Sequence, residues 1–227
     1  MTAPDYGATV ARWRDGAGAP WRQFTRHAFV EGLRDGTLPR AAFLRYLVQD
    51  YVFLVHFARA WSLAVVKSDT LNEMRTCAAT VDALVNQEMS LHVSVCAANG
   101  IDEATLFGAA ESDQTLAYTR YVMDAGLQGD FLDMMAALAP CVVGYGEIGA
   151  RLARERSDGT PYADWIGTYA DPGYQSLCTG VGAMIDTAVA RRIGSLPDAP
   201  RAGQLQERFT RATMLEISFW QMGLVGA

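Results

Sequence analysis

The sequence predicts an all-α fold, a bundle of seven or more helices with short loops around one core. Apolar residues recur at helical spacing along almost the whole chain, and no stretch alternates apolar and polar residues as a strand would. Half of the 227 residues are hydrophobic and only 19% are charged, which is sufficient for a core without disulfides. No linker divides the chain, so residues 1–227 are expected to form one domain.

Local signals set the limits of the expected helices. Gly18-Ala19-Pro20 separates the first two, and in Thr37-Leu38-Pro39 the threonine is expected to N-cap the next, with proline in its first turn. That long helix is apolar on nearly every face, which is typical of a buried central helix, and Asn99-Gly100 ends the one after it. The expected helices span residues 9–17, 21–33, 40–67, 70–98, 102–107, 115–127, 130–156, 161–167, 172–192 and 204–223.

Charge and composition exclude several classes of protein. The 19 basic and 25 acidic residues give a net charge of −6, without the basic stripe that a nucleic-acid partner would require. Residues 1–18 lack the apolar centre of a signal peptide, and no uninterrupted apolar stretch of about 18 residues would span a bilayer. We therefore expect a cytoplasmic protein with four reduced cysteines, none of them in a C-x-x-C pair.

Asp50 is the first polar residue that does not suit its surroundings. It lies in the middle of the long apolar helix, and helical spacing places three aromatic residues on its face: Tyr46, Phe53 and Phe57. A buried carboxylate must be paired, protonated or directed into a cavity. An aromatic wall with one acid would suit a flat, nitrogen-rich ligand; the alternative is a structural ion pair with an arginine such as Arg26 or Arg59.

Glu216 repeats this anomaly near the end of the chain, inside the apolar stretch 214–220. A carboxyl group surrounded by aromatic residues tends to have a raised pKa, which suits a general acid. A structural salt bridge is the alternative explanation.

Cys141 is the third candidate. It follows Pro140 in a helical stretch, Tyr145 lies one turn beyond it, and three glycines allow backbone or ligand to approach closely: Gly144, Gly146 and Gly149. A thiol beside a phenol is a plausible nucleophile site, although a buried free cysteine usually acts only as a small hydrophobic residue. The other three cysteines are expected to be core residues.

Two other kinds of site have less support. No G-x-S-x-G elbow accompanies the serine, histidine and aspartate residues that a hydrolytic triad would use. Glu88 and His92 stand four residues apart and could place two metal ligands on one helix face. With three histidines in the whole chain, a buried hydrogen-bonded pair is the simpler expectation, and we expect neither metal nor cofactor.

Together these residues resemble the TenA, or thiaminase II, family along nearly the whole chain. The ordered set and its spacing carry the resemblance. The matching residues are 24–40, 46–57, 88–92, 117–119, 136–141 with Tyr145 and Glu147, 165–169, and Glu216 with Phe219 and Trp220. The resemblance implies a heme-oxygenase-like fold without heme, assembled as a homotetramer, in the class of members that carry the active cysteine.

The resemblance also implies an activity and its residues. Family enzymes hydrolyse 4-amino-5-aminomethyl-2-methylpyrimidine to the hydroxymethyl pyrimidine and ammonia, and many cleave thiamine into the same pyrimidine and its thiazole. The catalytic cysteine falls on Cys141 and the catalytic carboxylate on Glu216, while Asp50 holds the amino edge of the pyrimidine. The site tyrosines fall on Tyr118, Tyr145 and Tyr169. A family tyrosine appears here as Phe53, which with Tyr46 or Tyr169 is expected to stack on the ring.

Glu216 is expected to protonate a ring nitrogen, after which the Cys141 thiolate adds to the ring, the leaving group departs and water replaces it. Two other functions stay open at this point. One is a non-catalytic protein that binds a pyrimidine or acts as a regulator. The other is an oxidase or di-metal oxygenase of the same fold, which would need more histidine than this chain has.

Overall fold

The computed structural model describes residues 3–225, which contain twelve α-helices and no β-strand, as expected for an all-α fold. The N-terminal helices are α1 (Ala8–Ala17), α2 (Ala19–Thr25) and α3 (Ala28–Asp35). The prediction of one helix over residues 21–33 is wrong, because the chain breaks at Arg26 and His27. His27 is extended and its ring Nδ1 accepts a hydrogen bond from the backbone N–H of Phe29, so the histidine N-caps α3.

The long helix α4 (Arg40–Lys67) has the limits that the sequence predicts, but its N-cap differs. Pro39 occupies that position, so the prediction of Thr37 as the N-cap is wrong. The Thr37 hydroxyl instead donates to Asp35 Oδ1 at 2.6 Å and closes the turn after α3. Proline is tolerated at the N-cap because a helix start has no intrahelical partner for a backbone N–H there.

The helical stretch expected over residues 70–98 is continuous, yet its geometry changes in the middle. It starts as α5 (Leu71–Ala83) with a capping box between Thr70 and Glu73, and it passes through a π-helical turn (η1, Leu84–Glu88) into α6 (Met89–Ala97). A π turn takes up an extra residue, so the side chains that follow it are rotated relative to a regular α-helix. The short α7 (Glu103–Phe107) comes next.

The second half of the chain contains α8 (Asp113–Gln128), α9 (Phe131–Glu155), α10 (Ala163–Ala170), α11 (Pro172–Ile193), the 3₁₀ turn η2 (Leu196–Asp198) and α12 (Ala202–Leu224). Four of these helices agree with the predicted limits to within about two residues. The exception is α10, which starts and ends later than the expected residues 161–167.

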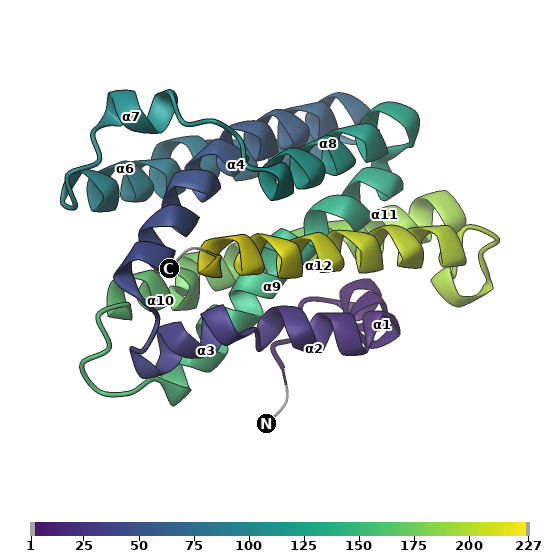
Figure 1. Cartoon of the computed structure of the whole chain (residues 1–227). Coiled ribbons are helices and arrows are strands. Elements are labelled where there is room, and N and C mark those ends of the chain that lie inside the picture. Colours follow the sequence, from purple (N-terminus) through teal and green to yellow (C-terminus); the bar gives the residue numbers. More distant parts are fainter. Residues whose placement is uncertain (1–2, 226–227) are drawn as a thin grey trace.

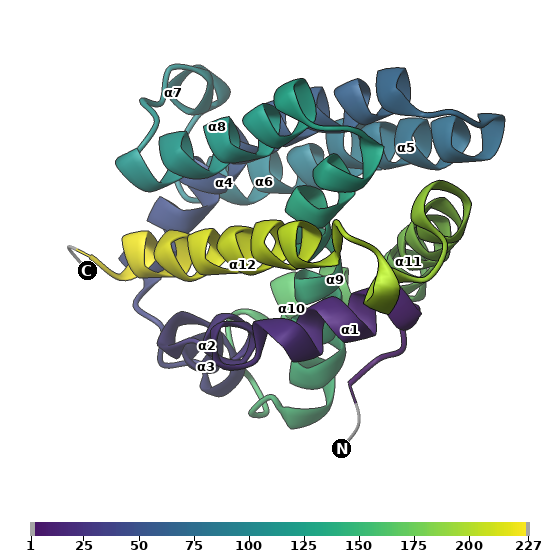
Figure 2. The same cartoon turned by 90° about the vertical axis from the view of Figure 1, so that its right-hand side faces the viewer.

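The central element is α9, which packs against α8, α10, α11 and α12. Figures 1 and 2 show α4, α6 and α8 on one side of the molecule, α1–α3 on the other, and α12 crossing between them. Length and composition alone would allow α9 to cross a membrane, but 89% of its most apolar window is buried inside the protein. That burial is typical of a core helix.

Glycines let other helices approach α9 closely. A Cβ on Gly144 would collide with the ring of Phe24, and a Cβ on Gly149 would lie 2.6 Å from the Cβ of Tyr169 in α10. The glycines after Cys141 therefore serve helix packing. Helix α9 itself continues through Pro140.

Candidate active site

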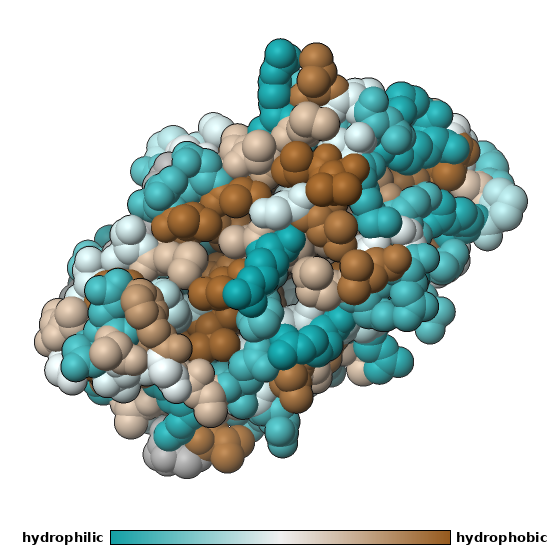
Figure 3. All heavy atoms as spheres, turned by 90° about the horizontal axis from the view of Figure 1, so that it is seen from above, coloured by the Kyte–Doolittle hydropathy of each residue, from teal (hydrophilic) through white to brown (hydrophobic). Residues whose placement is uncertain are grey.

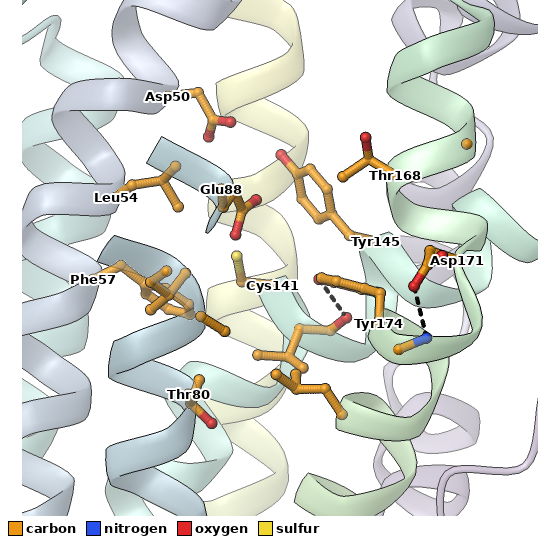
Figure 4. Close-up of a pocket in the computed structure, with 16 residues that line it drawn as sticks. Asp50, Leu54, Phe57, Thr80, Glu88, Cys141, Tyr145, Thr168, Asp171 and Tyr174 are labelled. Carbon is orange, nitrogen blue, oxygen red and sulfur yellow. Dashed lines mark hydrogen bonds between the residues drawn. The ribbon is translucent and has the colours of Figure 1, made fainter. Parts of the chain in front are cut away.

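A cavity of about 530 Å³ lies among α4, α5, η1, α9, α10 and α11. Figure 4 shows that the side chains of Asp50, Glu88, Cys141 and Tyr145 are directed into the same space. Much of the remaining wall is apolar, including Leu54 and residues of α5, η1 and α11. A few polar groups converging in a largely apolar pocket are typical of a small-molecule site.

Cys141 places its thiol in this cavity from the middle of α9 and is half-buried. Burial, together with the negative charges of Glu216, Glu88 and Asp50, raises the pKa of the Cys141 thiol well above its ordinary value. The resting site therefore holds a neutral thiol, and a thiolate must be formed during the reaction. The cysteines expected to be core residues are indeed buried and unpaired: Cys77, Cys96 and Cys178.

Glu216 projects from α12 and is 1% exposed. The Tyr118 hydroxyl donates a hydrogen bond to its Oε1 at 2.8 Å. Burial raises the pKa of Glu216 to about 8; the hydrogen bonds from Tyr118 and Cys141 act against the shift, and the charge of Asp50 adds to it. Within residues 3–225, the hydrogen-bond partners of Glu216 are the phenol of Tyr118 and the thiol of Cys141, and Glu216 forms no salt bridge.

Asp50 is held by two donors, and neither is an arginine. The Tyr46 hydroxyl lies 2.8 Å and the His92 Nε2 lies 2.7 Å from the same oxygen, Oδ2. His92 Nδ1 also lies 2.8 Å from the backbone carbonyl oxygen of Glu88, which can only accept. Because both ring nitrogens face acceptors, the imidazolium form satisfies both contacts.

The pKa of His92 agrees with that assignment. Burial lowers it, but the hydrogen bond to Asp50 and the charges of Asp50 and Glu88 outweigh burial and raise the pKa above its ordinary value. Asp50 is thus a carboxylate paired with a buried cation. Its second oxygen, Oδ1, takes no part in either of these two hydrogen bonds.

The predicted aromatic residues fall into two groups. Tyr145 lines the cavity, whereas Tyr46, Tyr118 and Tyr169 are buried and donate to carboxyl groups of the site. Phe53 is 3% exposed and does not line the cavity; its ring packs against Tyr118 with centroids 4.8 Å apart.

Glu88 was not among the predicted site residues, yet it lines the cavity. The Tyr169 hydroxyl donates to its Oε1 at 2.7 Å. The sequence signals were its helical spacing to His92, for which a buried hydrogen-bonded pair is the simpler expectation, and the match of residues 88–92 to the TenA family. Within residues 3–225, no group of three or more His, Cys, Asp or Glu side chains could hold a metal ion. Tyr174 is a second cavity residue that the sequence did not single out.

Comparison with known proteins agrees with the fold and with the family resemblance. The model of the TENA/THI-4/PQQC family matches residues 17–225. The chain is 33% identical over 204 residues to an aminopyrimidine aminohydrolase of Halalkalibacterium halodurans, and the alignment covers 89% of each chain.

Solved structures extend the similarity to three dimensions. A protein of Silicibacter sp. TM1040, described as a TenA family transcription regulator, is 54% identical with a TM-score of 0.95 and coverage of 97% of this chain and 98% of that one. A Shewanella denitrificans domain of unknown function, described as having a heme oxygenase-like fold, is 12% identical with a TM-score of 0.71. The alignment covers 95% of this chain and 91% of that one. The fold is therefore heme-oxygenase-like, and the chain belongs to the TENA/THI-4/PQQC family, as its resemblance to TenA proteins predicts.

Proposed function

We propose that this protein is an aminopyrimidine aminohydrolase of thiamine salvage. Its substrate is 4-amino-5-aminomethyl-2-methylpyrimidine and its products are the hydroxymethyl pyrimidine and ammonia; thiamine is a second substrate with a thiazole leaving group. The observation that carries the proposal is the Cys141 thiol in a cavity where the charges of Asp50, Glu88 and Glu216 all act on it. The similarity to the H. halodurans enzyme supports the same activity.

The pyrimidine binds with its amino edge towards Asp50. A carboxylate held by Tyr46 and His92 through Oδ2 can accept from the amino group through its other oxygen. Tyr145 provides an aromatic wall, since it lines the same cavity. The two hydrogen bonds fix the orientation of the carboxylate before the ligand arrives, which lowers the cost of binding.

The reaction begins with proton transfers at Glu216 and Cys141. Glu216, whose pKa is about 8, carries a proton at neutral pH and gives it to a ring nitrogen, which makes the ring a better electrophile. The resulting carboxylate then accepts the thiol proton of Cys141, its hydrogen-bond partner, and the sulfur forms a bond to a ring carbon.

The remaining steps replace the leaving group by water. The ring electrons expel ammonia from the exocyclic methylene, with the C–N electron pair leaving on nitrogen. Water adds to the methylene and loses a proton, and the C–S bond breaks to return the thiolate. Glu216 returns the thiol proton to Cys141 and takes back its own proton from the ring nitrogen, so the net change is one water consumed and one ammonia released.

Cys141→Ser tests the nucleophile. Ammonia release from the aminomethyl pyrimidine should fall to the background rate, because serine lacks the nucleophilicity of sulfur, while calorimetry should still detect binding of the pyrimidine. Cys77→Ser, at a core thiol of α5, is the matched control and should keep turnover. Turnover retained by Cys141→Ser would show that the thiol does not attack the ring.

A regulatory role is the second candidate, because the Silicibacter relative is described as a transcription regulator. The net charge of −6 does not favour binding to a DNA backbone. Ammonia release by the purified wild type distinguishes the two functions, since a pyrimidine-binding regulator would bind the substrate without turnover. An oxidase or oxygenase would instead acquire iron when the metal is added, which metal analysis detects.

We also propose a homotetramer. Helices α4, α7 and α8 lie on the face seen in Figure 3, where hydrophobic groups reach the surface. Exposed hydrophobic side chains of these helices are Val66, Phe107, Leu116 and Leu127. Light scattering after gel filtration should give four times the chain mass of 24.7 kDa. A single-chain mass at micromolar concentration would contradict the tetramer.

A further inference from the structure

Carboxyl groups dominate the charge of the cavity. Among the residues that the structure describes, its lining contains Asp50, Glu88 and Asp171 and has no lysine, arginine or histidine. Asp50 is paired with the His92 imidazolium, and Asp171 is an exposed residue whose Oδ1 accepts from the backbone N–H of Gly173 at the start of α11. Glu88 differs from both, because it is half-buried and is directed into the cavity beside Cys141.

The hydrogen-bond partner of the Glu88 carboxyl group is neutral. Tyr169 donates to Oε1, and within residues 3–225 no ion pair joins Glu88 to a cation. Burial raises the pKa of Glu88, although the nearby charge of His92 acts in the opposite direction. A half-buried carboxyl group beside the reacting thiol, with no cation paired to its oxygens among the described residues, is arranged to receive a positively charged ligand group.

We propose that Glu88 binds the positive charge of the leaving group, and so makes the site selective for pyrimidines whose departing group is cationic. The inference rests on the proposed function. An aminomethyl group is an alkylammonium at neutral pH, and thiazolium carries a permanent charge. The hydroxymethyl product is neutral, so this contact offers it no attraction between opposite charges.

The same contact keeps the substrate in its reactive protonation state. Transfer of an ammonium into a largely apolar cavity lowers its pKa, as it does for a buried lysine. A neutral amine is a poor leaving group, because the C–N electron pair would have to leave on an amide ion. The carboxylate of Glu88 opposes this deprotonation, so that the group departs as ammonia without a further proton donor.

Glu88→Gln in the Cys141→Ser background tests the proposal, because the serine prevents turnover during a binding measurement. Calorimetry is carried out with the aminomethyl and the hydroxymethyl pyrimidine. Affinity for the aminomethyl compound should fall by about 10- to 100-fold, as for the loss of a charge-assisted hydrogen bond. Affinity for the hydroxymethyl compound should change by less than about threefold.

Asp102→Asn is the matched control for the loss of one carboxylate charge. Asp102 is exposed, does not line the cavity and caps α7, a cap that asparagine keeps, so the preference for the aminomethyl compound should stay that of the parent. Should Glu88→Gln fail to fold, Glu88→Asp is measured instead. The shorter acid retains charge but loses reach, and it should weaken aminomethyl binding selectively.

Equal weakening of the binding of both pyrimidines, or an unchanged preference for the aminomethyl compound, would overturn the role of Glu88. A failure of the proposed function would give a different result. In that case the wild type releases no ammonia, and Cys141→Ser binds neither pyrimidine.

Discussion

Replacing Glu216 by glutamine should stabilise the protein at alkaline pH while it lowers turnover. Burial holds the pKa of Glu216 at about 8, against 4.5 for an ordinary glutamate. At pH values between these two pKa values, Glu216 keeps its proton in the folded state and has released it in the unfolded state. The wild type therefore loses stability as pH rises through this range. Glutamine has no such proton and can still accept the hydrogen bond from Tyr118.

The difference between the two pKa values sets the size of the effect. One pKa unit corresponds to about 1.4 kcal/mol, so ionisation of Glu216 costs on the order of 5 kcal/mol of stability at pH well above 8. Between about pH 5 and about pH 8.5, the free energy of unfolding of the wild type should fall by about 4 kcal/mol more than that of Glu216→Gln.

Urea unfolding of both proteins at equal concentration, under reducing conditions, measures this difference. Other titrating groups are common to the two proteins and cancel in the comparison. Glu207→Gln makes the same change at an exposed residue of α12 and keeps Glu216, so its stability should fall with pH as that of the wild type does. A stability difference between wild type and Glu216→Gln that is the same at both pH values would refute the raised pKa.

Three further predictions concern the pH profile, the buried cation and the packing of α9. The kcat of the wild type should decrease as pH rises through about 8, since Glu216 then loses the proton it supplies, and the residual kcat of Glu216→Gln should lack this decrease. His92→Leu leaves the Asp50 carboxylate without its cation. Urea unfolding should show a free energy of unfolding lower by about 3–5 kcal/mol, and calorimetry should show a pyrimidine affinity reduced at least about tenfold. Unchanged values would contradict the imidazolium assignment. Gly149→Ala should lower the free energy of unfolding by about 1–3 kcal/mol, because the new methyl group collides with α10. The control Gly180→Ala has no described atom from another helix within 4 Å of its added Cβ and should raise the free energy of unfolding by up to about 1 kcal/mol. Equal effects of the two substitutions in urea unfolding would argue against the close approach of α10 to α9.

The long helices could be predicted because their signals are local. Apolar periodicity identifies α4 to the residue, although its N-cap is Pro39 and not Thr37, and it identifies α9 to within one residue at each end. The break between α2 and α3 has no comparable signal, since apolar residues keep their helical spacing across it. There the break depends on the extended backbone of His27 and on the bond its ring accepts from Phe29.

The candidate site was predictable to the extent that it consists of polar residues inside apolar helices. Asp50 and Glu216 stood out for this reason, and the structure places both close to Cys141. Their partners could not be read from the chain, because Tyr118 and His92 come from helices distant in sequence. Long-range pairing of this kind depends on how helices pack.

Phe53 and Glu88 show more clearly what helical spacing could not predict about the site. One-face spacing with Asp50 suggested that Phe53 lines the pocket, but a helix face is wide enough for Phe53 to pack in the core against Tyr118. Glu88 looked like an ordinary helical partner of His92. Glu88 is the last residue of the π turn, and this turn, which hydrophobic periodicity does not reveal, sets the direction of its side chain.

The π turn has a consequence for how this site can be altered. Because an α-helix turns by about 100° per residue, a one-residue deletion in the regular part of α5 would rotate all the side chains after it, including Glu88 and His92. The π turn already holds one residue more than α geometry needs, so a deletion between Leu84 and Asn86 would return the segment to α geometry and leave α6 in register. The π turn is therefore the place in this helix where the chain can be shortened by one residue while His92 keeps its place beside Asp50.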